Sequence, residues 1–283
     1  MKTSVKRSVA LLALLATTGS TMAGNITVKG SDTLVILAQK WAEVYMTKNP
    51  GTKIQVTGGG SGIGIAALQN NTTDIANSSR PIKAAERAAC IKNFGKNPRE
   101  YKVALDGLSI YVSSSNPLTE INLDQLKDIF TGKARNWKDF GGPDEAITVY
   151  SRENSSGTYE FFKEHVLKGQ DFVSSAQTMP GTAAVLQAVS KDKNGIGYGG
   201  AAYGHDAKVL KVKKTAESAA IEATQENVLT QKYPIWRYLY MYLSPDKDKG
   251  ETAAFLNWVR GDEGQAVVKE VGYYPLPDGL REK

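Results

Sequence analysis

The chain of 283 residues is poor in the side chains that most often carry metal or redox chemistry. It contains one cysteine, Cys90, and two histidines, His165 and His205. A single cysteine excludes an intrachain disulfide, so the fold must be held by its own apolar core, which this length permits. One cysteine and two scattered histidines also give no spacing typical of a transition-metal site. We therefore expect no metal and no other cofactor.

The chain also lacks a serine set up as a nucleophile. Neither Ser79 nor Ser156 lies in a Gly-x-Ser-x-Gly motif, and a nucleophilic serine needs a nearby base. His165 would lie on the same helix as Ser156, about 13 Å away at about 1.5 Å per residue, which is too far. His205 remains formally possible as a base, although a packing or surface role is the more common one for a lone histidine. We predict a protein that is not an enzyme.

No apolar run approaches the roughly 20 residues that a membrane helix requires. The first residues instead have the pattern of a secretory signal peptide, in which Lys2, Lys6 and Arg7 precede a short apolar core and small residues end at Ala23. We predict a signal peptide over residues 1–23, with cleavage after Ala23. No cysteine follows the apolar core, so a lipid anchor is not indicated. The mature chain is expected to be periplasmic and freely soluble.

A large excess of charge of one sign is also absent. The net charge is +6, from 35 basic against 29 acidic residues. Removing the three basic residues of the predicted signal peptide leaves 32 against 29, a net charge of +3. The basic residues alternate with acidic ones along the chain, so a nucleic-acid surface is not expected. A mildly positive surface would still favour the approach of a small anion.

Short strand-to-helix units are what the sequence does have. Three follow one another in the first part of the chain, and the turns between strand and helix carry hydroxyl groups at residues 30–33, 58–62 and 77–81. In the second turn we expect the glycines to let the backbone approach a ligand and Ser61 to cap the helix. Repeated units of this kind predict parallel sheets covered by helices, with a ligand beyond the carboxyl ends of the strands.

A fourth turn, residues 151–158, is the most distinctive stretch. It follows the β-prone run 147–150 and carries Arg152, while Ser156 stands where a helix N-cap is expected. Unpaired N–H groups at a helix N-terminus, a positive dipole end and a permanently charged guanidinium together suit a small oxyanion. An ordinary capped turn with an exposed arginine is the alternative for this stretch on its own.

Asp32, in the first turn, bears on the choice of anion. A site built only from donors holds a fully ionised anion such as sulfate, whereas a carboxylate repels one. A carboxylate can instead accept a hydrogen bond from an anion that keeps a proton, as phosphate does near neutral pH. The alternative is that Asp32 only caps its helix.

Two long β-prone apolar runs, residues 103–112 and 233–242, bracket the middle of the chain. They suggest two crossings between two domains, and therefore a hinge. We predict a lobe I of residues 24–110 and 238–283 and a lobe II of residues 111–237, with the ligand in the cleft between them. After the second run, one helix is expected over residues 252–271.

Taken together, these motifs resemble the phosphate-binding periplasmic proteins of ABC transporters, the PstS family. The likeness covers essentially the whole mature chain, and the order and spacing of the motifs are more specific than any single one. The matching stretches are residues 30–34, 58–62, 74–80, 106–107, 126–132, 136–137, 151–158, 264–265 and 272–277. The resemblance implies a two-lobed α/β periplasmic-binding-protein fold (type II), each lobe a mainly parallel sheet flanked by helices. It also implies a protein that captures phosphate in the cleft and delivers it to an ABC permease in the inner membrane. We expect this protein to be a monomer.

Carried over by position, the resemblance implies a phosphate site with residues from both lobes. The expected residues are Ser31, Asp32, Thr33, Ser61, Ser79 and Arg80 from lobe I and Arg152, Ser156, Gly157 and Thr158 from lobe II. The well-studied members have an aspartate where this chain has Ser79, so we expect the acceptor carboxylate at Asp32 instead, with Arg80 adding a second positive charge. The alternatives are a binding protein for another tetrahedral oxyanion, an anion-sensing receptor module and an exported phosphatase.

Overall fold

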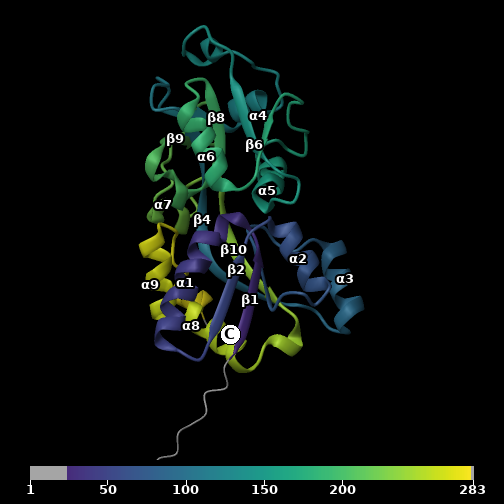
Figure 1. The fold of residues 1–283 in the computed structure, drawn as a ribbon. Coiled ribbons are helices and arrows are strands. Elements are labelled where there is room, and N and C mark those ends of the chain that lie inside the picture. The colour runs from purple at the N-terminus through teal and green to yellow at the C-terminus, as the bar shows by residue number, and fades with distance from the viewer. Residues whose placement is uncertain (1–23, 282–283) are drawn as a thin grey trace, which may run out of the picture.

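The computed structural model describes residues 24–281, with the side chains of residues 205 and 206 left out. The predicted signal peptide lies outside these residues, so cleavage after Ala23 stays a prediction. The chain folds into a mixed α/β structure that is elongated, with an upper and a lower part (Figure 1). Two strands, β4 (Arg99–Val112) and β10 (Trp236–Leu243), run through the junction between the parts. Within residues 24–281, no helix is both long and apolar enough to cross a membrane.

The lower part is built from the strand-to-helix units predicted for the first part of the sequence. β1 (Asn25–Gly30) pairs in parallel with β2 (Lys53–Thr57) on one side and with β3 (Ile75–Ser78) on the other. Because the three strands run the same way, the turns that follow them meet at one edge of the sheet. The helices that follow these strands are α1 (Val35–Lys48), preceded by the 3₁₀ helix η1 (Asp32–Leu34), then α2 (Ser61–Gln69) and α3 (Ala84–Phe94).

The upper part repeats this architecture with other strands. β6 (Thr148–Arg152) pairs in parallel with β7 (Gln177–Met179) and with β8 (Gly195–Gly200). A further parallel pair consists of β5 (Glu120–Asn122) and β9 (Lys208–Lys213). The helices are α4 (Leu123–Phe130), α5 (Gly157–His165), α6 (Thr182–Lys191) and α7 (Gln225–Leu229). Since α5 follows β6 after a short turn, the strand, turn and helix predicted around residues 147–162 are confirmed.

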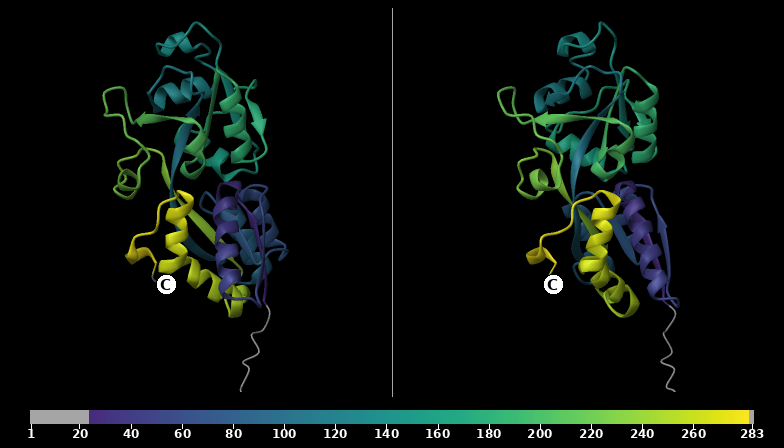
Figure 2. Two further views of the ribbon diagram at one scale, coloured as in Figure 1. Left: turned by 60° about the vertical axis from the view of Figure 1, so that its left-hand side comes forward. Right: turned by 90° about the vertical axis from the view of Figure 1, so that its left-hand side faces the viewer.

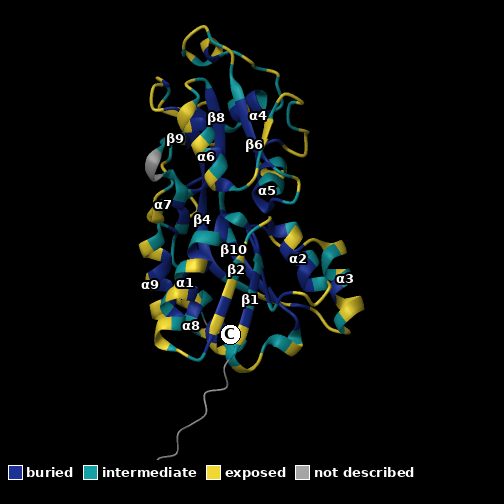
Figure 3. Cartoon of the chain, viewed as in Figure 1, coloured by how far each residue is buried: buried dark blue, intermediate teal, exposed yellow. Residues whose placement is uncertain are grey.

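The crossing strands β4 and β10 join the two parts into one ten-stranded sheet. They pair with each other in antiparallel fashion, and β10 also pairs with β3 while β4 pairs with β8 and β9. The main strand order is β2-β1-β3-β10-β4-β8-β6-β7. The sheet is therefore mixed, with parallel pairs inside each part and antiparallel pairs at the crossing. Both crossing strands are largely buried (Figure 3), as their long apolar runs predict.

The apolar core is divided at the junction. One large cluster draws mostly on residues up to Ala104 and from Leu239 onward. The other draws mostly on the stretch from Leu105 to Ile235. Each part of the molecule consequently has a core of its own, which is what an independent lobe needs. The lobe boundaries given above stay a prediction.

The C-terminal segment differs from the single helix expected over residues 252–271. Two helices, α8 (Gly250–Arg260) and α9 (Asp262–Val271), meet at Gly261, whose backbone is extended. Gly264 brings α9 so close to the end of α8 that a Cβ on it would lie 2.5 Å from the Cα of Val259. The chain therefore changes direction at Gly261, and the two helices flank the lower part (Figure 2).

Candidate functional site

Four buried hydroxyl side chains meet at the junction between the two parts. Thr33 Oγ1 lies 2.8 Å from Thr158 Oγ1, and Ser79 Oγ lies 3.4 Å both from Thr158 Oγ1 and from Ser61 Oγ. Three of these residues follow β1, β2 and β3, and the fourth lies in the first turn of α5. The predicted turns thus come together around one point. We call these four residues the hydroxyl cluster.

Ser156 is the N-cap of α5, as predicted. Its Oγ accepts hydrogen bonds from the backbone N–H groups of Thr158 and Tyr159, both at 3.2 Å. Gly157, the first residue of α5, contacts the hydroxyl cluster directly, because a Cβ on it would lie 2.8 Å from Ser79 Oγ and closer still to Ser61 Oγ. The absence of a side chain at residue 157 therefore lets the positive end of the helix dipole reach the cluster.

The glycine-rich turn before α2 brings the backbone against the upper part. Gly60, with a φ of 95°, is the N-cap of α2, and a Cβ on it would lie 2.5 Å from the carbonyl oxygen of Ser155. The backbone N–H of Gly62 donates to that same oxygen at 2.9 Å. The prediction that Ser61 caps the helix is wrong, because its Oγ instead accepts a hydrogen bond of 3.0 Å from the backbone N–H of Ser79.

Arg152 is enclosed at the end of β6, with 2% of its surface exposed. Its guanidinium donates to Asp32 Oδ2 at 2.6 Å and to Thr182 Oγ1 at 3.0 Å, and its Nε lies 3.4 Å from Glu153 Oε2. A guanidinium has five N–H groups, so donors remain for a ligand. Arg152 is thus a buried cation. Its partner Asp32 directly precedes Thr33, a member of the hydroxyl cluster, in the chain.

Asp32 links the two parts of the molecule instead of capping a helix. The N-cap of η1 is Ser31, and no side chain caps it. Asp32 Oδ1 accepts a hydrogen bond of 2.8 Å from the backbone N–H of Gly59, while Oδ2 bonds Arg152 across the junction. The hydroxyl of Tyr203, in the upper part, donates to the carbonyl oxygen of Asp32 at 2.8 Å. Burial, followed by the charge of Asp32, raises the pKa of Tyr203 to about 12, so this hydroxyl stays protonated at physiological pH.

Arg80 does not hydrogen-bond with the other predicted site residues. Its two terminal nitrogens bind both oxygens of Glu86, at 2.8 and 2.7 Å, and Nη1 also donates to the carbonyl oxygen of Pro81 at 3.0 Å. Burial acts to raise the pKa of Glu86, but the hydrogen bonds and the charge of Arg80 outweigh it, and the pKa lies below its usual range. This ion pair at the start of α3 gives no support to Arg80 as a second positive charge of the site.

Ser31, another predicted site residue, contributes a backbone hydrogen bond. Its N–H donates to the carbonyl oxygen of Asn77 at 2.9 Å, which fixes the first turn to the end of β3. The side chain of Ser31 is buried next to Asp32. Ser31 therefore holds the turn from which Asp32 and Thr33 project.

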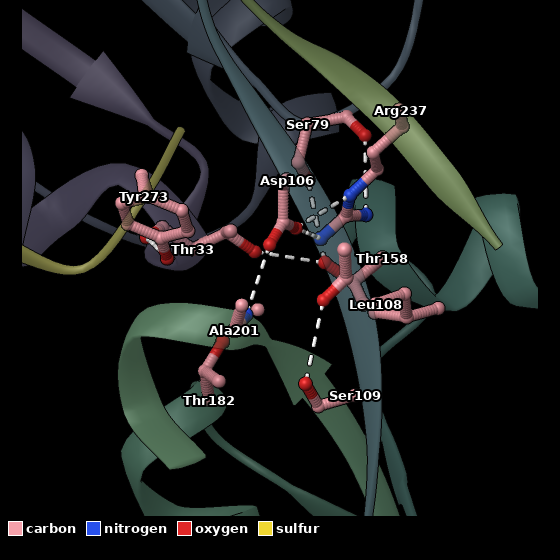
Figure 4. Close-up of polar contacts among 12 residues, drawn as sticks. Thr33, Ser79, Asp106, Leu108, Ser109, Thr158, Thr182, Ala201, Arg237 and Tyr273 are labelled. Atoms are coloured by element: carbon pink, nitrogen blue, oxygen red, sulfur yellow. Dashed lines mark hydrogen bonds and ion pairs between the residues drawn. The ribbon is translucent and has the colours of Figure 1, made fainter. Parts of the chain in front are cut away.

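A second buried ion pair lies at the junction, between the crossing strands (Figure 4). Arg237 Nε and Nη2 donate to Asp106 Oδ2 at 2.9 and 2.8 Å, and the backbone N–H of Ala201 donates to Asp106 Oδ1 at 2.9 Å. Arg237 Nη1 also donates to the carbonyl oxygen of Ser79 at 3.2 Å. This pair connects β4, β10, the 3₁₀ helix η3 (Ala201–Asp206) and the third turn of the lower part. We call Asp106 and Arg237 the crossing pair.

Sequence reasoning did not assign a site role to Thr182 or to the crossing pair. The signal for Thr182 is its place after Gly181, at the start of another helix that follows a strand. The signal for Asp106 and Arg237 is a charged residue inside each of the two long apolar runs, since buried charges are rare unless they are paired.

Further contacts join the two parts beside the bonds within the hydroxyl cluster. Among them are the backbone hydrogen bond from Gly62 to Ser155 and an ion pair in which Lys83 Nζ lies 2.5 Å from Glu160 Oε2. The side chains of Lys83 and Glu160 are 45% and 22% exposed, so this pair lies nearer the surface. Among the residues that the structure describes, no group of three or more His, Cys, Asp or Glu side chains is placed to hold a metal ion.

Comparison with known proteins assigns the chain to a family. A sequence model for the PBP superfamily domain matches residues 15–263. The chain is 34% identical over 280 residues to the phosphate-binding protein PstS of Pseudomonas aeruginosa, a match that covers 93% of this chain and 87% of that one. The chain belongs to the PstS family. It is also 32% identical over 256 residues to PstS of Bacillus subtilis, covering 90% and 82% of the two chains.

Solved structures similar to this PstS-family chain agree with its fold. A candidate phosphate ABC transporter substrate-binding protein from Clostridium perfringens, solved with bound phosphate, has a TM-score of 0.82 and 30% identity. The match covers 89% of this chain and all of that one. An ABC-type phosphate transport receptor from Vibrio cholerae has a TM-score of 0.71 and 27% identity, and the match covers 89% of this chain. The resemblance read from the motifs and the predicted periplasmic-binding-protein fold are therefore confirmed.

Proposed function

We propose that this chain is an exported binding protein that captures inorganic phosphate between two lobes and delivers it to an ABC-type permease in the inner membrane. Its relatives named PstS are phosphate-binding proteins, and a similar solved structure holds phosphate. We take lobe I as residues 24–110 and 238–283 and lobe II as residues 111–237, since the two largest apolar clusters separate near these positions. The mature protein acts in the periplasm as a monomer, after removal of residues 1–23.

The observation that carries the proposal is the meeting of Arg152, the N-terminus of α5 and the hydroxyl cluster at the junction. They supply a permanent positive charge, backbone N–H groups and hydroxyl donors, which is the set that a small oxyanion requires. The hydroxyls bond one another at 2.8 to 3.4 Å, and a bound anion takes over these donors. The proposed phosphate-binding residues are Ser31, Asp32, Thr33, Ser61 and Ser79 from lobe I and Arg152, Ser156, Gly157 and Thr158 from lobe II.

The hydrogen bonds of such a site are strong enough to account for tight binding. A hydrogen bond to a charged group contributes about 1.5–3 kcal/mol, and a micromolar complex requires about 8 kcal/mol. A full set from both lobes exceeds this value, and the surplus offsets desolvation of the anion and ordering of the lobes. Periplasmic binding proteins as a class close around their ligands by hinge motion. The permease can then recognise the closed, phosphate-bound conformation.

Titration calorimetry of the mature protein tests the proposal directly. We expect phosphate to bind in the micromolar range or tighter, and arsenate to bind as well because it has the same shape and also keeps a proton. Sulfate and molybdate should bind more weakly. An absence of phosphate binding at millimolar concentration would rule the proposal out, and tighter binding of sulfate than of phosphate would make the protein a receptor for another oxyanion.

The substitution Gly157→Ala should weaken phosphate binding about tenfold, the scale of an overpacked contact, without unfolding the protein. The φ of Gly157 is outside the left-handed region, so alanine is compatible with the first turn of α5. Its Cβ would lie 2.8 Å from Ser79 Oγ, so the lobes must stay slightly apart. Calorimetry measures the affinity, and thermal unfolding checks the fold.

Gly279→Ala is the matched control for this substitution. No heavy atom lies within 4 Å of a Cβ at Gly279, so phosphate affinity should not change. If Gly157→Ala also leaves the affinity unchanged, α5 does not approach the hydroxyl cluster this closely in the bound state.

A further inference from the structure

We propose that Asp106 is the residue that selects phosphate, because its carboxylate accepts the hydrogen bond from the P–OH group of the bound anion. The proposal rests on the phosphate-binding function proposed above and deepens it. It moves the acceptor role from Asp32, in the first turn, to the middle of the crossing strand β4.

The position of Asp106 places a buried carboxylate at the base of the junction. Asp106 is fully buried and lies directly opposite Arg237 in the register of β4 and β10. Arg237 in turn bonds the carbonyl oxygen of Ser79, a member of the hydroxyl cluster, at 3.2 Å. In Figure 4 the carboxylate of Asp106 lies among Thr33, Ser79 and Thr158 and points toward the side where the hydroxyls of Thr33 and Thr158 meet. The buried carboxylate of Asp106 is thus linked to the hydroxyl cluster through one side chain, that of Arg237, which bonds both Asp106 and the backbone of Ser79.

The carboxylate of Asp106 also has hydrogen-bonding capacity left. Two carboxylate oxygens accept about four hydrogen bonds. Oδ2 accepts two from Arg237, and Oδ1 accepts one from the backbone N–H of Ala201. One position therefore remains on Oδ1. A P–OH group can donate there, whereas an anion without a proton would place an oxygen lone pair against Oδ1 and be rejected.

The bonds of Asp32 suit it for a different task. Its Oδ2 bonds Arg152 at 2.6 Å and its Oδ1 bonds the backbone N–H of Gly59 at 2.8 Å. Its side chain is 18% exposed, whereas that of Asp106 is 0% exposed. A carboxylate that bonds the arginine directly positions this cation for the anion, and a partly hydrated one discriminates less between anions. We therefore assign Asp32 to the positioning of Arg152 and Asp106 to selection.

The first test measures phosphate and sulfate affinity by calorimetry for the wild-type protein and for Asp106→Asn. The amide can donate to sulfate, so we expect the preference for phosphate over sulfate to shrink about tenfold or more, on the scale of one hydrogen bond to a charged group. A purely structural role predicts that both affinities fall by the same factor, and this outcome would overturn the proposal. A wild-type protein that binds no phosphate would instead refute the proposed function itself.

The second test needs no change at Asp106 and applies even if Asp106→Asn does not fold. Phosphite loses its last O–H group at its second ionisation near neutral pH, whereas phosphate keeps an O–H group after its own second ionisation. Across this pH range we expect the wild-type protein to lose phosphite affinity about tenfold or more relative to phosphate. The variant Asp32→Asn should show the same loss.

The variant Asp32→Asn identifies which carboxylate is the acceptor. If Asp32→Asn abolishes the loss of phosphite affinity with rising pH, the acceptor is Asp32 and the proposal is wrong. If the wild-type protein shows no such loss, no carboxylate accepts the proton of the anion and the proposal is also wrong. Persistence of the loss in Asp32→Asn supports Asp106.

Discussion

Replacing Arg152 by alanine should weaken phosphate binding by about 2–5 kcal/mol, roughly 30-fold or more in the dissociation constant. Arg152 is the buried cation of the junction, with 2% of its surface exposed, and it bonds Asp32 and Thr182 from two sides. These two contacts fix its orientation, so little order is lost when it binds an anion. Titration calorimetry with phosphate on the mature protein measures the loss. An unchanged affinity would remove Arg152 from the binding site.

Two further variants show what the arginine supplies. Arg152→Lys keeps the charge but loses the planar fork that holds Asp32 and Thr182 together, so we expect an affinity between those of the wild-type protein and the alanine variant. Arg281→Ala is the matched control, because Arg281 bonds the fully exposed carboxylate of Asp262 at 3.0 Å. Its phosphate affinity should equal that of the wild-type protein.

Replacing Arg237 by methionine should lower the free energy of unfolding by about 3–5 kcal/mol, the typical cost of breaking a buried ion pair. The substitution leaves Asp106, which is fully buried, with a charge and without its ionic partner. It also removes the hydrogen bond from Arg237 to the carbonyl oxygen of Ser79. Denaturation by urea, followed by circular dichroism, gives the free energy of unfolding.

Arg87→Met is the control for the loss of the crossing pair. Arg87 bonds Glu100 at 3.0 Å, and both side chains are about one third exposed, at 36% and 35%. A pair of this exposure contributes only about 0–1 kcal/mol, so the variant should unfold like the wild-type protein. If the free energy of unfolding of Arg237→Met is no lower than that of Arg87→Met, the crossing pair is accessible to water and does not behave as a buried ion pair.

Local patterns were enough to predict the turns that form the hydroxyl cluster. Ser156 caps α5 because its side chain lies at the N-cap of a helix that begins at the next residue, a relation within a few positions of sequence. Thr33, Ser61 and Ser79 meet because they follow three strands that run in the same direction. Neither inference needs knowledge of distant contacts.

The sequence does not show which partner a charged side chain binds when that partner depends on how separate elements pack. The bond between Arg237 and Asp106 spans 131 positions and depends on the register of β10 against β4, which includes a shift between Leu239 and Tyr240. The partner of Arg80 is Glu86, only six positions away, but both the turn and the start of α3 are needed to bring them together. An arginine next to a predicted anion site can thus be part of the supporting framework.

The helix expected over residues 252–271 shows a related limit. Its apolar spacing suits one helix, and the break at Gly261 comes from the close packing of Gly264 on the backbone of α8. A close approach between two helices leaves no mark on apolar periodicity. In the sequence only Gly261 and Gly264 indicate this close approach, and glycine also occurs for other reasons, for example in tight turns and at helix ends.

The contacts that join the two parts outside the hydroxyl cluster have a consequence for the proposed transport function. The bond between Gly62 and Ser155 and the ion pair between Lys83 and Glu160 need no phosphate, so in the proposed receptor they would stabilise the empty protein with its two parts in contact. In the proposed transport function, an empty protein held together in this way would lower the apparent phosphate affinity in proportion to the fraction of molecules that are open. Dissolved salt weakens a partly exposed pair such as Lys83 and Glu160. For the proposed receptor we therefore expect the fraction of empty protein that is open to phosphate to rise with ionic strength.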